Sequence, residues 1–79
     1  MALWAFVDAG DLEAGANPVK TYKRAATRSA LLRYLSFDPD AVADWNPDRI
    51  IAREDPPILI RNQKSQANVR VNVCQLQVV

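Results

Sequence analysis

The central stretch of the chain, residues 19–36, reads VKTYKRAATRSALLRYLS and contains a candidate strand followed by a candidate helix. Its first part, residues 19–26, mixes β-branched, aromatic and basic residues in short alternation, which is typical of a strand. If this part were a helix, its basic residues would form one exposed stripe. Leu31 and Leu35 would extend the same stripe, which would place apolar groups in water. We therefore expect a strand over residues 19–26, although the pattern also allows a helix.

The second part of this stretch has the features of a helix that begins after Thr27. A threonine hydroxyl at this position can accept a hydrogen bond from a backbone N–H one turn into the helix. Leu31, Leu32 and Leu35 would then form the buried stripe of that helix. The sequence thus predicts a helix over residues 28–36.

Four further stretches have the composition of strands. The first is apolar on both alternating faces, which suits a strand inside a sheet, and we expect it to pair with residues 19–26. The second also allows one helical turn. In the last, the apolar positions shift by one near Val73-Cys74, which either a bulge there or burial of both strand faces would explain. These stretches are residues 2–8, 49–53, 58–61 and 68–78.

Two connecting segments are predicted from turn and helix-start residues. Residues 8–11, DAGD, have turn chemistry and begin a loop that runs to Pro18. Pro39 is typical of the first position of a helix, because its missing N–H would be unsatisfied there anyway. A short helix is therefore predicted from Pro39 to Asp44 or Trp45.

Together these elements predict one small α+β domain over residues 1–79. Its expected form is an antiparallel sheet of four to five strands with one main helix packed on one face. The length of 79 residues, with 49% apolar residues, suits one domain. No apolar run approaches the ~18 to 20 residues of a membrane span, and no signal peptide is visible at the amino end. We expect a cytoplasmic location.

The residue types that are missing restrict the possible chemistry. The chain contains no histidine, which excludes Ser-His and Cys-His nucleophile pairs and histidine-containing metal sites. The single cysteine, Cys74, lies in an apolar alternating stretch and is expected to be a core residue without a chemical role. We therefore expect no enzymatic activity, no cofactor and no metal.

The charges are unevenly placed, although the formal net charge is only +1. Residues 1–18 carry three acids and no base, residues 19–37 five bases and no acid, residues 38–55 six acids and two bases, and residues 56–79 three bases and no acid. Neighbouring blocks could neutralise each other across the surface. Alternatively, they could form an acidic and a basic face, which would suit binding to a charged macromolecule. On that interpretation the candidate partner contacts are Asp40, Asp44, Asp48, Glu54 and Asp55.

The junction of residues 22–30, YKRAATRSA, with Arg33-Tyr34-Leu35 after it, resembles a strand that runs into a helix in small proteins of phages and mobile elements. The chain length and the Ala-, Arg- and Asp-rich composition are also similar to those of small anti-CRISPR proteins that act on type I systems, type I-C among them. The resemblance implies stoichiometric binding to a subunit of a type I surveillance complex in the host bacterial cell, which would block recognition of target DNA.

Two other functions are compatible with the sequence. One is a small phage regulator that binds nucleic acid through the basic segment of residues 20–33. The other is a phage structural or assembly subunit, which would associate with itself as concentration rises, whereas the protein-binding reading expects a monomer or a weak homodimer. The contacts of the nucleic-acid reading would be Lys20, Lys23, Arg24, Arg28 and Arg70.

Overall fold

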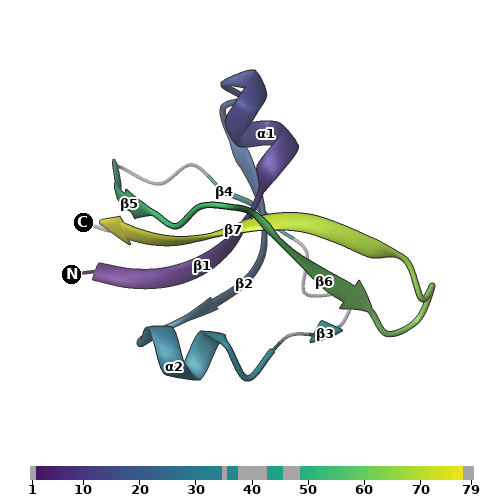
Figure 1. Ribbon diagram of the computed structural model, residues 1–79. Helices are drawn as coiled ribbons and strands as arrows, with labels where there is room; N and C mark the ends of the chain where they lie inside the picture. Colours follow the sequence, from purple (N-terminus) through teal and green to yellow (C-terminus); the bar gives the residue numbers. More distant parts are fainter. Residues whose placement is uncertain (1, 35, 38–42, 46–48, 78–79) are drawn as a thin grey trace.

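The computed structural model describes residues 2–34, 36–37, 43–45 and 49–77 (Figure 1). This part of the chain forms seven strands and two short helices. In chain order the elements are β1 (Ala2–Asp8), α1 (Ala9–Ala14), β2 (Val19–Ala25), α2 (Arg28–Leu31), β3 (Ser36–Phe37), β4 (Ala43–Trp45), β5 (Arg49–Arg53), β6 (Ile58–Asn62) and β7 (Asn68–Gln77).

All seven strands belong to one sheet. Their order is β3-β6-β7-β1-β2-β4, and β5 also pairs with β7. The five longer strands, β1, β2, β5, β6 and β7, pair antiparallel, whereas the two-residue strand β3 runs parallel to β6. The prediction of an α+β fold built on an antiparallel sheet is confirmed, as are the strands expected over residues 19–26 and 49–53.

Strand β7 is shared by three neighbours. Along one edge it pairs with β1 without interruption, from Ala2 opposite Gln77 to Asp8 opposite Val71. Along the other edge it pairs first with β6 and then with β5. The shift in its apolar pattern is therefore not a bulge in β7; the register shift on this edge lies in β5, around Ile51.

Both faces of the sheet are buried, each by a different helix (Figure 1). On one face, Phe6 and Val71 pack with Leu31 of α2, and on the other face Val7 and Cys74 belong to a second cluster, against which Leu12 of α1 packs. Strand β7 contributes Val71 and Val73 to the first cluster and Cys74 and Leu76 to the second. Burial of both faces thus explains why its apolar positions change parity.

Helix α1 lies where the sequence predicts a loop, so that prediction is wrong for residues 9–14. The Asp8 carboxylate caps the helix, because its Oδ1 accepts a hydrogen bond from the backbone N–H of Asp11 at 3.0 Å. Gly15 ends the helix with a φ of 67°, a left-handed conformation that glycine adopts without steric cost. The same DAGD residues that favour a turn also favour a helix start.

Helix α2 begins as predicted but ends early. The Thr27 hydroxyl accepts from the backbone N–H of Ala30 at 3.1 Å, which confirms the predicted cap. The helix ends at Leu31, and Ser36 already belongs to β3, because the chain extends there to pair with β6. One main helix over residues 28–36 is therefore not observed. Neither helix of the described residues is long and apolar enough to cross a membrane.

The predicted short helix from Pro39 to Asp44 or Trp45 is only partly testable. Residues 39–42 lie outside the described residues. Residues 43–45 form β4, which pairs antiparallel with β2. The helix prediction is wrong for these three residues, because pairing with a neighbouring strand overrides the local helix-start signal.

Candidate partner-binding surface

Two of the five predicted acidic contacts lie together in the structure. Glu54 and Asp55 are adjacent in the segment between β5 and β6. Asp44 belongs to β4, a strand that pairs with β2, and its position there is opposite Lys20. Asp40 and Asp48 lie outside the described residues. The structure thus brings Glu54 and Asp55 to one place and puts Asp44 on a separate strand.

Glu54 is held by a two-point ion pair with Arg28 at the start of α2. The Arg28 Nε and Nη2 atoms donate to the two carboxylate oxygens of Glu54, at 2.5 and 2.8 Å. The Glu54 backbone N–H also donates to the Val73 carbonyl at 2.9 Å. The hydrogen bonds from Arg28 lower the pKa of Glu54, and Glu54 in turn raises the pKa of Arg28. Glu54 therefore stays ionised and fixed in position.

Asp55 is positioned by a buried amide. The Asn72 Nδ2 atom donates to the Glu54 carbonyl at 2.9 Å and to Asp55 Oδ1 at 3.1 Å. Asn72 is buried in β7, so these two bonds satisfy a polar group that would otherwise be costly inside the protein. The second Asp55 oxygen lies 3.5 Å from Arg53 Nε. Both acids are thus oriented by residues of other elements while their carboxylates remain accessible.

Two large apolar side chains lie just before these acids in β5. Ile50 is 36% exposed and Ile51, at the irregularity of the strand, is 45% exposed. Within the described part of the chain, β5 pairs along one edge only, with β7. We refer to Ile50, Ile51, Glu54 and Asp55 as the β5 surface.

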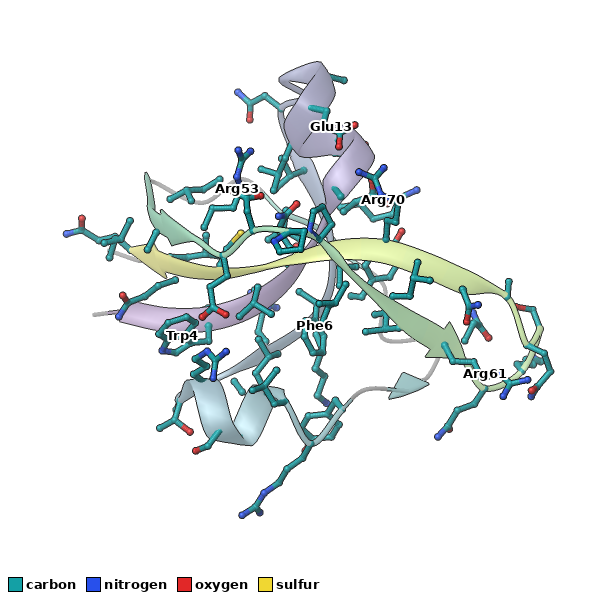
Figure 2. All side chains as sticks on the ribbon, in the orientation of Figure 1. Trp4, Phe6, Glu13, Arg53, Arg61 and Arg70 are labelled. Atoms are coloured by element: carbon teal, nitrogen blue, oxygen red, sulfur yellow. The ribbon has the colours of Figure 1, made fainter. Side chains whose placement is uncertain are left out.

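The ion pairs show how the charge blocks of the sequence meet. Arg28, from the basic block of residues 19–37, pairs with Glu54, from the acidic block of residues 38–55. Arg70, from the basic block of residues 56–79, pairs at 2.6 Å with Glu13, from the acidic block of residues 1–18. Figure 2 shows Glu13 and Arg70 reaching toward each other from α1 and β7. At these residues the blocks neutralise each other.

The basic residues of the nucleic-acid hypothesis differ in the contacts that their side chains make. Arg28 and Arg70 are occupied by the carboxylates of Glu54 and Glu13. The Lys23 Nζ atom lies 4.1 Å from the centre of the Tyr34 ring, within the range of a cation–π interaction. The remaining two, both exposed, are Lys20 and Arg24.

Sequence reasoning missed the residues that connect α1 to the sheet. The Tyr22 hydroxyl donates to Asp8 Oδ2 at 2.7 Å, so one carboxylate caps the helix and anchors it to β2. Burial, followed by the bond to Asp8, raises the pKa of Tyr22. Asp8 three residues before Asp11, with Gly15 after them, was the signal that could have predicted this helix.

Cys74 is buried, as predicted, and burial raises its pKa to about 11. The thiol is therefore neutral at ordinary pH and packs as a small apolar group. Among the described residues, no group of three or more His, Cys, Asp or Glu side chains could hold a metal ion.

No protein-family model matches the chain, and comparison with curated proteins and with solved structures gives no match.

Proposed function

We propose that the chain is a non-enzymatic protein-binding domain that contacts its partner through the β5 surface. The observation that carries this proposal is the exposure of Ile50 and Ile51, at 36% and 45%, next to two oriented carboxylates. Protein interfaces commonly combine an apolar centre with a polar rim. Because Glu54 and Asp55 are already held in place, binding would cost little side-chain entropy at these positions.

The resemblance to anti-CRISPR proteins makes a type I surveillance complex the first partner to test. A surface of apolar side chains and oriented carboxylates could cover a site on a complex subunit that otherwise receives DNA, and recognition of target DNA would then be blocked. Asp40, Asp44 and Asp48 belong to the proposal as further contacts.

The proposal can be tested by a pull-down of the tagged protein from a bacterial lysate that contains a type I surveillance complex. The experiment is run at about 50 mM and about 200 mM salt, and bound proteins and nucleic acid are identified. Recovery of subunits of the complex at both salt concentrations supports the proposal.

Recovery of nucleic acid alone, lost at the higher salt, contradicts it and favours the nucleic-acid reading, because phosphate contacts release counterions and weaken steeply with salt.

A further inference from the structure

The early end of α2 creates a second surface, at the opposite end of that helix from the Arg28–Glu54 pair. After Leu31 the chain makes a tight turn, in which the backbone N–H of Tyr34 donates to the Leu31 carbonyl at 3.0 Å. Arg33 and Tyr34 are exposed beyond this turn. Had α2 continued to Ser36, Tyr34 would lie on the helix, one turn after Leu31. The position of this surface therefore depends on the end of α2 at Leu31.

The parallel pairing of β3 with β6 brings another base to the same place. Ser36 lies opposite Arg61, so Arg61 is next to a residue only two positions after Tyr34. Figure 1 shows β3 beside the end of β6, and Figure 2 shows Arg61 there. Lys23 reaches the same region from β2, where its ammonium group lies over the Tyr34 ring. We refer to Lys23, Arg33, Tyr34 and Arg61 as the basic–aromatic patch.

Three arginines elsewhere in the described chain are paired with carboxylates, whereas the basic side chains of this patch are not. Arg28, Arg53 and Arg70 each have a carboxylate partner within 4.0 Å. Within the described residues, Lys23, Arg33 and Arg61 have none. Their positive charge is therefore not neutralised by these residues, and the Lys23 ammonium group lies over the ring of Tyr34, which is 42% exposed.

We propose that the basic–aromatic patch binds single-stranded nucleic acid, with a base stacked on Tyr34 and phosphates contacted by Lys23, Arg33 and Arg61. Exposed aromatic rings beside basic side chains are the usual elements of such sites, because every base has a π-face and every nucleotide carries a phosphate. An acidic peptide would contact the three basic side chains but would gain less from the tyrosine ring. The patch is separate from the β5 surface, so it is an additional activity and can fail or succeed independently of protein binding.

The test measures the binding of a fluorescent oligothymidine of about 12 nucleotides to the full chain at about 50 mM salt. We expect Tyr34→Ala, Arg33→Glu and Arg61→Glu each to weaken binding about tenfold, since one stacked base or one charged hydrogen bond contributes that much. Tyr34→Phe keeps the ring and should stay within about twofold of the unmodified protein. Thermal unfolding of each variant confirms that it is folded.

The matched control is Lys20→Glu, which makes the same change of charge as Arg61→Glu at an exposed base on the other end of β2. It should leave binding within about twofold. If Lys20→Glu weakens binding as much as Arg61→Glu, or if Tyr34→Ala has no effect, binding follows net charge and the proposal is overturned. It is also overturned if the oligonucleotide does not bind, or if a polyglutamate peptide competes with it equally well.

Discussion

Two threonines that lie close in sequence have opposite effects on the stability of the folded chain. Thr21 is buried in β2, and its hydroxyl has no hydrogen-bond partner among the described residues. Thr27 is exposed, and its hydroxyl caps α2. A buried polar group without a partner lowers stability, whereas a helix cap raises it. The same substitution should therefore have opposite effects at the two positions.

We expect Thr21→Val to raise the free energy of unfolding by about 1 kcal/mol, because an apolar group of the same shape replaces the unpaired hydroxyl. Thr27→Val should lower it by about 1 kcal/mol, because the Ala30 N–H loses its acceptor. Urea unfolding of both variants measures the difference. A loss of stability in Thr21→Val would show that the hydroxyl has a partner in the folded protein.

Cys74 should make stability depend on alkaline pH. Its pKa is raised from 9.0 in the unfolded chain to about 11 in the folded protein, mainly by burial. The contribution of the neutral thiol to the free energy of unfolding is therefore complete below pH 9. It is lost as the pH rises toward 11, on the order of 2 kcal/mol over that range. Unfolding measured from pH 8 to 11 should show this decline.

Tyr22 should also lower stability at alkaline pH, because its pKa is raised in the folded protein by burial and by Asp8. Cys74→Ala should make the decline less steep, and adding Tyr22→Phe should flatten it further. An unchanged slope in Cys74→Ala would contradict the buried position of the thiol.

Gly15 determines where α1 ends. Its φ of 67° is left-handed, and a Cβ at this position would meet no neighbouring atom within 4 Å. A substitution there acts through backbone strain alone. Gly15→Ala should lower the free energy of unfolding by about 1 kcal/mol, whereas Gly15→Asn should cost less, because asparagine tolerates this conformation. Equal costs for both, measured by thermal unfolding, would be inconsistent with the left-handed end.

The five longer strands could be predicted from sequence because their signal is local, whereas the sequence predicts a helix at Ser36 of β3 and at Asp44 of β4. The apolar patterns of residues 2–8 and 68–78 predict strands. In the structure β1 pairs along its whole length with β7. The helices were harder. Residues 8–11 suit both a turn and a helix start, and the anchor that decides between them, the Tyr22 hydroxyl, lies farther along the chain.

The end of α2 could not be predicted from its own residues. Leu31, Leu32 and Leu35 have helical spacing, but pairing with β6 extends the chain at Ser36. That competing interaction comes from a strand much later in the sequence, so no local pattern shows it.

The acidic block is visible in the sequence, but the residues that contact it in the folded chain are not. The tertiary fold brings Arg28 to Glu54 and Asn72 to Asp55, which turns two exposed acids into oriented ones. Asn72 in particular had no sequence signal beyond its place in an alternating strand. The site prediction therefore identified candidate residues, while the apolar half of the surface, Ile50 and Ile51, came only from exposure in the structure.

The chain should remain a monomer as its concentration rises. Among the described residues β5 pairs along one edge only, so its other edge could pair with a second copy. The irregularity at Ile51 interrupts this edge, which disfavours such pairing. Sedimentation equilibrium should give the monomer mass at all concentrations. A mass that increases with concentration would favour an assembly subunit.

The most direct test of protein binding through the β5 surface is the affinity of the labelled chain for a purified type I surveillance complex. Ile51→Ser and Glu54→Lys should each raise the Kd at least about tenfold, because they remove an apolar contact or reverse an oriented charge. Glu13→Lys, which breaks the exposed Arg70–Glu13 pair, should leave the Kd within about twofold. If the unmodified chain does not bind, this complex is not its partner, and if Glu13→Lys weakens binding as much as Glu54→Lys, the β5 surface is not where this protein meets its partner.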